Sequence, residues 1–248
     1  MSELIVALDE PSADAALRIV EQTAEAVHWY KVGYQAYYAY GPRIMAELSR
    51  RHKQIFLDLK LHDIPSTVAA AVTALRNTGA AMLTLHAAGG ARMLEAAVAA
   101  RDAATNNGIT AAASSSKTIG STAMRLIAVT VLTSIESDDL VQLGIEVAPR
   151  TLALHLANIA SACGVDGIVC AVEDAKLIRE QKMPLLLVCA GIRAQDSARH
   201  DQRRTATARE AAQAGADFIV VGRPITSAPD PAAAARAFIA QCTGAGSA

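Results

Sequence analysis

The chain has 248 residues, of which 52% are hydrophobic and 19% are charged, and its formal net charge is -1. A chain of this length can form one α/β barrel of roughly 250 residues or two smaller domains, so length alone leaves both open. The small net charge gives no electrostatic basis for binding nucleic acid or an anionic membrane, which makes a small-molecule partner the expectation.

The N-terminus and the cysteines indicate a cytoplasmic protein. The opening segment, MSELIVALDE, lacks the basic region of a signal peptide, and no later apolar run approaches the roughly 20 residues that span a bilayer. Cys163, Cys170, Cys189 and Cys242 show no C-x-x-C spacing, which argues against a zinc site or a disulfide framework. We therefore predict reduced thiols and no metal site.

Short apolar runs alternate with longer helical patterns along the chain. The predicted strands are, in order, Leu4–Leu8, His28–Val32, Ile55–Leu61, Met82–His86, Leu126–Leu132, Gly167–Cys170, Leu185–Val188 and Phe218–Val221. The predicted helices between and after them are Ala13–Glu25, Thr67–Asn77, Ala91–Ala104, Thr151–Cys163, Thr207–Ala214 and Ala232–Gln241. Eight strands in this alternation favour a (β/α)8 barrel, the TIM barrel fold.

The competing architecture is a doubly wound open sheet, which uses the same alternation. Its dinucleotide-binding members carry G-x-G-x-x-G after the first strand, whereas this chain reads ALDEPSAD there. We therefore expect residues 1–248 to form a single barrel domain, with a flexible Ala- and Ser-rich insertion near residues 105–122.

The third predicted strand, within FLDLKLHDIP (56–65), has one apolar and one charged face. Because side chains alternate along a strand, one face carries Ile55, Leu57, Leu59 and Leu61, and the other carries Phe56, Asp58, Lys60 and His62. Pro65 ends the strand, and Ser66 or Thr67 is the expected N-cap of the next helix. A structural ion pair is the alternative reading of the charged face, but burying charges for stability alone is energetically poor.

Polar residues recur where the predicted strands end. They are Asp9, Lys31, Asp58 with Lys60 and Asp63, His86, Thr130 with Thr133, Arg193, and Gly222 with Arg223. The active sites of (β/α)8 barrels lie at the carboxyl ends of the strands, so these residues are the candidates for a single site.

Two segments suggest a phosphate group on the ligand. VVGRPIT (220–226) places Gly222 and Arg223 after the eighth strand, where backbone N–H groups and a guanidinium can bind phosphate. The polar stretch Ala190–Arg204 has the length of a lid, with Arg193 and Gln202 as candidate ligand groups. The alternatives are a structural Gly-Pro turn beside a surface arginine and a solvated charged loop.

Several motifs together resemble the orotidine 5'-phosphate decarboxylase family, in its bacterial type. They are LIVALD (4–9), KVG (31–33), FLDLKLHDIPST (56–67), HAAGGARM (86–93), IAVTVLTS (127–134), GIR (191–193), DQRR (201–204) and VVGRPIT (220–226). D-x-K-x-x-D-I-P is the specific element. The resemblance implies a (β/α)8 barrel, a homodimer and a reaction without metal or organic cofactor. Cys189-Ala190 and Ser66 depart from the family's usual Thr-Pro and Asn.

The resemblance also implies a role for each residue in converting orotidine 5'-phosphate to UMP. Lys60 would be the proton donor, Asp58 its neighbour beside the departing carboxylate, and Asp63 with Thr67 would reach across the dimer interface. The substrate-binding residues implied in the same way are Asp9 and Lys31 at the ribose hydroxyls, and Thr133, Arg193, Gln202, Gly222 and Arg223 at the pyrimidine and phosphate end. Asp58 and Asp63 would keep Lys60 positively charged.

Two other functions stay open at the level of the sequence. A sugar-phosphate decarboxylase similar to the 3-keto-gulonate 6-phosphate enzyme has a comparable D-x-K-x-x-D and uses magnesium. A non-catalytic barrel that binds a nucleotide or phosphate is the second. The H-D-I-P continuation, DQRR and VVGRPIT favour the pyrimidine nucleotide over the sugar phosphate, and the complete Asp58, Lys60 and Asp63 set argues against a non-catalytic barrel.

Overall fold

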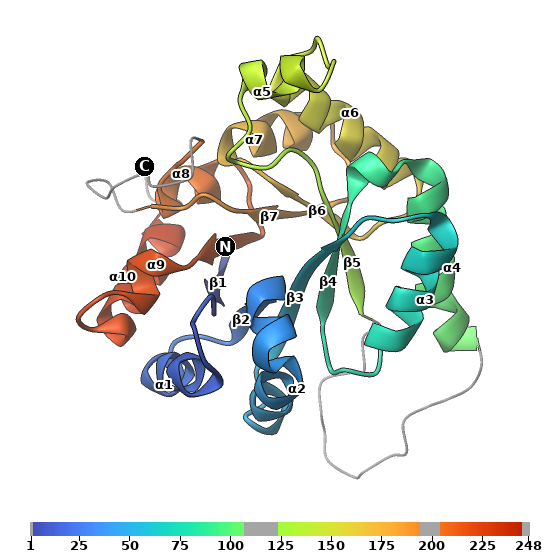
Figure 1. The fold of residues 1–248 in the computed structure, drawn as a ribbon. Coiled ribbons are helices and arrows are strands. Elements are labelled where there is room, and N and C mark those ends of the chain that lie inside the picture. The colour runs from blue at the N-terminus through green and yellow to red at the C-terminus, as the bar shows by residue number, and fades with distance from the viewer. Residues whose placement is uncertain (1, 107–123, 194–203, 245–248) are drawn as a thin grey trace.

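The computed structural model describes residues 2–106, 124–193 and 204–244. Eight parallel strands close into a barrel in sequence order, and helices surround it (Figure 1). The strands are β1 (Glu3–Ala7), β2 (Trp29–Gly33), β3 (Gln54–Leu61), β4 (Met82–His86), β5 (Arg125–Val129), β6 (Gly167–Cys170), β7 (Leu186–Cys189) and β8 (Phe218–Val221). This topology confirms the predicted (β/α)8 barrel.

Some of the helices outside the barrel were predicted from the sequence. The sequence patterns gave no bounds for the others. The expected ones are α1 (Ala13–Thr23), α3 (Pro65–Leu75), α4 (Ala91–Asn106), α6 (Pro149–Ala162), α8 (Ala208–Gln213) and α10 (Pro231–Thr243). The others are α2 (Tyr34–Arg50), the short 3-10 turn η1 (Ala87–Gly89), α5 (Ser137–Gln142), α7 (Val172–Glu180) and α9 (Arg223–Thr226).

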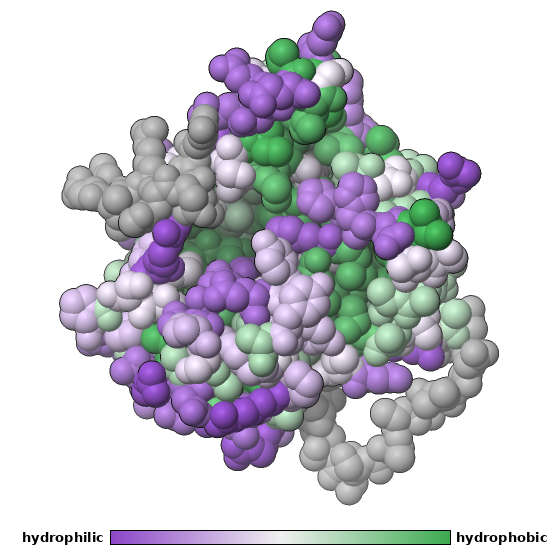
Figure 2. Space-filling model, viewed as in Figure 1, coloured by the Kyte–Doolittle hydropathy of each residue, from purple (hydrophilic) through white to green (hydrophobic). Residues whose placement is uncertain are grey.

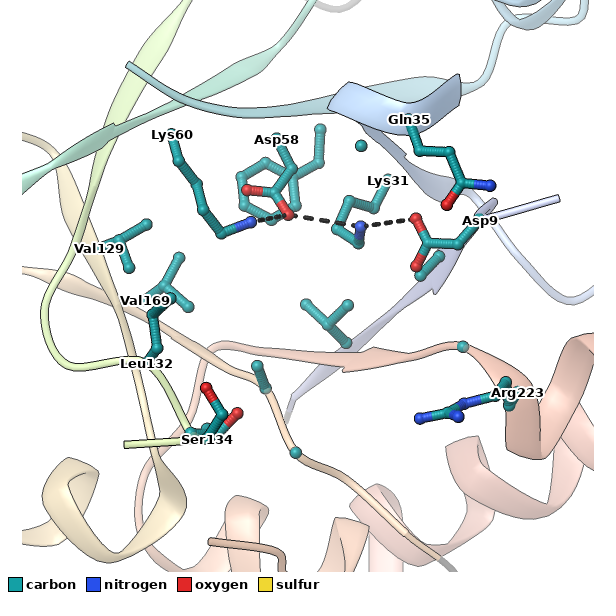
Figure 3. Close-up of a pocket in the computed structure, with 18 of the residues that line it drawn as sticks. Asp9, Lys31, Gln35, Asp58, Lys60, Val129, Leu132, Ser134, Val169 and Arg223 are labelled. Carbon is teal, nitrogen blue, oxygen red and sulfur yellow. Dashed lines mark hydrogen bonds and ion pairs between the residues drawn. The ribbon is translucent and has the colours of Figure 1, made fainter. Parts of the chain in front are cut away.

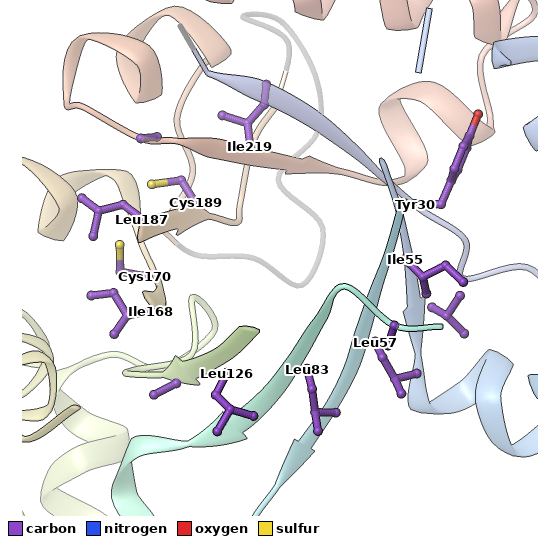
Figure 4. Packing of buried hydrophobic residues seen from close by; sticks show 14 of the residues in the cluster. Tyr30, Ile55, Leu57, Leu83, Leu126, Ile168, Cys170, Leu187, Cys189 and Ile219 are labelled. Carbon is purple, nitrogen blue, oxygen red and sulfur yellow. The ribbon is translucent and has the colours of Figure 1, made fainter. Parts of the chain in front are cut away.

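Alternation along the strands divides the apolar residues into two layers. The larger layer fills the space between the strands and the helices, with side chains such as Leu57, Leu83 and Leu126 pointing away from the barrel (Figure 4). The smaller layer lies inside the barrel and includes Phe56 and the edge-to-face pair Trp29 and Phe218, whose ring centroids are 5.2 Å apart. Since Trp29 and Phe218 begin their strands, the rings fill the amino-terminal half and leave the carboxyl half for polar groups.

Strand β3 confirms the predicted alternation in its first half and departs from it in its second. Leu57 pairs with Leu83 of β4, but the next pairing joins Leu61 to Leu85, so four steps along β3 correspond to two along β4. The intervening residues form a bulge in which Lys60 has a φ of 48°, in the left-handed region. A strict period of two does not predict this bulge.

Two segment ends differ from those that the sequence predicts, and two predicted segments fall largely outside the described residues. The expected cap at Ser66 or Thr67 is wrong, because α3 begins at Pro65, whose fixed φ suits the first helical position, and Ile64 is its N-cap. The β5 ladder ends at Val129 rather than Leu132. The Ala- and Ser-rich insertion and the middle of the Ala190–Arg204 stretch fall largely on residues 107–123 and 194–203, outside the described residues.

The described part of the chain shows the state of the cysteines and the character of the helices. All four cysteines are free thiols, with three of them buried. Among the described helices, none has the length and apolarity that crossing a bilayer requires.

Candidate active site

A cavity of about 700 Å³ opens at the carboxyl ends of the barrel strands. In the view of Figure 2, hydrophilic residues lie below and to the right of the central hollow, and hydrophobic residues are visible within it and above it. The predicted site residues that line the cavity are Asp9, Lys31, Asp58, Lys60, Thr133, Arg193, Gly222 and Arg223. Side chains from β1, β2, β3, β5, β7 and β8 and the loops after them therefore converge on one site, as the barrel geometry predicts.

A chain of four alternating charges crosses one wall of this cavity (Figure 3). Lys60 Nζ lies 2.8 Å from Asp58 Oδ2, and Lys31 Nζ lies 3.4 Å from the same oxygen. Lys31 Nζ also lies 3.1 Å from Asp9 Oδ1. Asp58 is therefore held between two ammonium groups. Of the four alternating charges, Lys60 is the one at the end that faces the open cavity.

Burial and charge act in opposite directions on Asp58. Burial alone would raise its pKa, but the charges of Lys31 and Lys60, together with hydrogen bonds from Lys60 and Thr84, hold that pKa below its usual value. Burial likewise opposes the charged form of Lys31, yet Asp58 and Asp9 raise its pKa overall. Asp58 and Lys31 are consequently both ionised at neutral pH despite being enclosed.

Thr84, at the middle of β4, belongs to the same network, and sequence reasoning missed it. Its hydroxyl accepts a hydrogen bond from the backbone N–H of Lys60 at 2.7 Å and donates one to Asp58 Oδ1 at 2.9 Å. The available signal was a lone hydroxyl within MLTLH, an otherwise apolar strand up to its terminal histidine.

Gly33 provides the space that the charged chain occupies. A Cβ at this position would lie 3.0 Å from Asp9 Oδ1 and 3.1 Å from Lys31 Nζ. A larger residue would require the ends of these two side chains to shift by a few tenths of an ångström, so glycine leaves the Asp9–Lys31 pair undisturbed.

The opposite side of the cavity has a different character. Arg223 begins α9 and directs its guanidinium toward the cavity from the side away from Lys60 (Figure 3). Thr133 and Ser134, in the turn after β5, and the buried Arg193, after β7, line the space between. Hydroxyl and guanidinium groups at this end suit an anionic, oxygen-rich ligand group.

Two of the predicted site residues that the structure describes do not line the cavity of the single chain. Asp63 and Thr67 lie on the exposed surface just beyond β3, where Asp63 Oδ1 accepts a hydrogen bond from the backbone N–H of Ile64. Gln202 lies outside the described residues. The cavity also has lining residues that the sequence did not single out, among them Tyr34 and Gln35 at the start of α2.

The described residues include no group of three or more His, Cys, Asp or Glu side chains arranged to hold a metal ion. The polar groups of the cavity are instead paired cations and anions, with hydroxyls and guanidiniums beside them. Such an array can bind an anionic ligand at one end and present a fixed ammonium at the other.

Comparison with known proteins places this geometry in a family. The sequence profile described as "Orotidine 5'-phosphate decarboxylase / HUMPS family" matches residues 2–238. Orotidine 5'-phosphate decarboxylase of Rhodopseudomonas palustris (strain BisB5) is 42% identical over 239 residues, covering 96% of this chain and 93% of that protein. The protein of the same name from Klebsiella pneumoniae (strain 342) is 41% identical over 238 residues, covering 96% and 91%.

A solved structure agrees with the sequence relatives. The crystal structure of orotidine 5'-phosphate decarboxylase from Lactobacillus acidophilus superimposes with a TM-score of 0.81 at 33% identity, covering 98% of this chain and 100% of that one. The profile, the near full-length relatives and the shared barrel have one explanation. The chain belongs to the orotidine 5'-phosphate decarboxylase / HUMPS family.

Proposed function

We propose that this protein decarboxylates orotidine 5'-phosphate to UMP without a metal or organic cofactor. The observation that carries the proposal is the Asp58–Lys60 pair, at 2.8 Å, on a cavity wall opposite Arg223. That arrangement offers an ammonium for the reacting carbon and a guanidinium for the distant phosphate. Relatives more than 40% identical that carry the decarboxylase name support the same reaction.

The chemistry explains why a fixed ammonium is needed. When the bond between the ring and the carboxylate breaks, CO2 leaves and its electron pair stays on the ring carbon, in the ring plane, where the π system cannot delocalise it. Lys60 stabilises this developing charge by preorganised electrostatics and then delivers a proton from Nζ to that carbon. Asp58 keeps the ammonium in place, and its own negative charge lies beside the substrate carboxylate.

The remaining cavity residues bind the rest of the substrate in this proposal. Asp9 and Lys31 bind the ribose hydroxyls, while Thr133 and Arg193 line the pyrimidine and phosphate end. Gly222, Arg223 and Gln202 bind the phosphate. Binding energy from this remote group can lower the barrier at the ring, because interactions away from the reacting bond help to orient it.

The proposal includes a homodimer of single-domain barrels in the cytoplasm, with Asp63 and Thr67 completing the partner's site. In the single chain both residues are exposed. Near them Ile64 is 64% exposed, and on α2 Tyr38 is 79% exposed. Large exposed side chains such as these, beside the residues assigned to the partner's site, support the proposal that a second copy of the chain covers this surface.

The test is loss of orotidine 5'-phosphate absorbance on adding purified protein, with and without EDTA. We expect turnover that is indifferent to the chelator, nearly lost in Lys60→Ala and retained in Lys176→Ala, which removes an exposed lysine from α7. Folded wild-type protein without turnover would defeat the proposal.

The sugar-phosphate alternative is separated by the same preparation. Turnover of a 3-keto sugar phosphate that requires magnesium, with none of orotidine 5'-phosphate, would assign the protein to that branch. Tight UMP binding without either reaction would assign it to the non-catalytic class.

A further inference from the structure

We propose that Thr84 is a positioning residue, whose hydroxyl fixes the backbone of Lys60 and the carboxylate of Asp58 so that the ammonium and the carboxylate meet. The inference rests on the proposed function for its catalytic consequence. Its structural part concerns only the β3–β4 contact.

Thr84 lies at the place where the ladder between β3 and β4 is interrupted. Its neighbours Leu83 and Leu85 pair with Leu57 and Leu61, and no ladder partner on β3 falls to Thr84 itself. On its other side Thr84 pairs regularly with Ile127 of β5. The bulge of β3 therefore faces the side chain of Thr84. Its hydroxyl accepts the hydrogen bond of the Lys60 backbone N–H, which a regular ladder would have given to a backbone carbonyl of β4.

One hydroxyl connects the two functional residues because it acts in both directions. It accepts from the backbone N–H of Lys60 at 2.7 Å and donates to Asp58 Oδ1 at 2.9 Å. The other carboxylate oxygen, Asp58 Oδ2, pairs with Lys60 Nζ at 2.8 Å. Lys60 is thus joined to Asp58 twice, directly through its side chain and through Thr84 from its backbone.

This double connection offsets an unfavourable backbone conformation. Lys60 has a φ of 48°, which residues other than glycine, asparagine and aspartate seldom adopt. Thr84 is 0% exposed, so its hydroxyl is shielded from bulk solvent. A β-branched side chain is also stiff at χ1, which keeps the hydroxyl directed at the bulge. A buried threonine suits this position because valine supplies no hydroxyl and serine is less constrained.

The matched test uses Thr84→Val, which keeps shape and removes the hydroxyl, and Thr84→Ser, which keeps the hydroxyl. The control is Thr23→Val, because Thr23 is 1% exposed and its hydroxyl also has two partners, the carbonyl of Ile19 and the Tyr30 hydroxyl, away from the cavity. We expect Thr84→Val to lower kcat about 10- to 100-fold, the scale of small misplacements of a reacting group, with KM changed by less than about threefold. Thr84→Ser should recover most of kcat, and Thr23→Val should keep it.

Amide hydrogen exchange tests the same contact without relying on turnover. In Thr84→Val the Lys60 amide should exchange at least about tenfold faster than in wild type, relative to the Leu57 amide of the same strand. If the wild type is active and Thr84→Val has the same kcat, the inference is overturned. It is also overturned if Thr84→Ser loses as much kcat as Thr84→Val. If folded wild-type protein shows no turnover, the proposed function fails, and exchange at Lys60 alone decides whether Thr84 holds the bulge.

Discussion

Lys60 combines the side chain proposed as proton donor with a left-handed backbone, and the two features can be separated by mutation. An L-residue in this region costs roughly 1–2 kcal/mol, whereas glycine adopts it freely. We expect Lys60→Gly and Lys60→Ala to be equally inactive, with Lys60→Gly more stable by about 1 kcal/mol in urea unfolding. At Lys176, inside α7, the order should reverse, because glycine in a helix is less stable than alanine by about 1 kcal/mol. Equal stabilities of the two Lys60 variants would contradict the strained conformation.

Asp58 gives a pH dependence whose sign follows from its lowered pKa. A carboxyl whose folded-state pKa lies below its unfolded value contributes stability above about pH 4, and that contribution is lost as pH falls through the folded-state pKa. Asp58→Asn lacks this contribution and leaves Lys31 and Lys60 without their shared counterion. Its deficit in unfolding free energy should therefore be largest near pH 7 and should shrink in acid. Urea unfolding between pH 2 and 7 checks this, and a deficit that stays constant would refute it.

At the scale of elements, one arginine fastens the turn after β5. Arg204 Nη2 donates to the carbonyl oxygens of Val131 and Leu132 at 3.0 and 3.2 Å, and its backbone N–H donates to the carbonyl of Thr133 at 3.1 Å. Its Nη1 donates to the buried Asp174 of α7 at 2.8 Å. The guanidinium therefore fixes a cavity wall that it does not itself line.

Arg204→Lys should weaken substrate binding more than it slows the reaction. An ammonium retains the charge but has no planar fork to bind carbonyls and carboxylate together, so the wall that carries Thr133 loses its support. We expect KM for orotidine 5'-phosphate to rise about tenfold, equivalent to about 1.4 kcal/mol, with a smaller change in kcat. The exposed Arg209 of α8 provides the control, Arg209→Lys, which should match wild type. A loss confined to kcat would count against this role.

The sequence predicted what depends on local periodicity and missed what depends on contacts between distant residues. The strands Met82–His86 and Phe218–Val221 were predicted to the residue because their apolar runs coincide with the ladder. The end of β5 was wrong by three residues, since Val131 and Leu132 look like strand but bind Arg204, more than 70 residues away. The cavity position of Asp58 and Lys60 followed from the charged face, but the bulge and the Thr84 hydroxyl between them arise only when β3 meets β4.

At the scale of the whole molecule, the barrel separates stability from function along its axis. The rings of Trp29 and Phe218 fill the amino-terminal half, Phe56 lies between them and the cavity that it lines, and the charged chain from Asp9 to Lys60 occupies the carboxyl half. Closely packed rings give the strands a rigid base. The charges can then be held at fixed positions where water and substrate enter, which preorganised electrostatics requires.

The proposed homodimer belongs to this largest scale, and subunit mixing tests it. If each site takes Lys60 from one chain and Asp63 from its partner, then Lys60→Ala and Asp63→Ala are each inactive as pure dimers. Mixing equal amounts and allowing exchange makes half of the dimers hybrids, and each hybrid has one intact site of two, so activity should recover to about a quarter of wild type. Mixing Lys60→Ala with Asp58→Ala is the control. Lys60 and Asp58 of one site come from the same chain, so each site of a hybrid dimer lacks one of them and no intact site forms. Light scattering on each mixture confirms assembly. Hybrids without activity, or a monomer with full turnover, would show that Asp63 does not act across the interface.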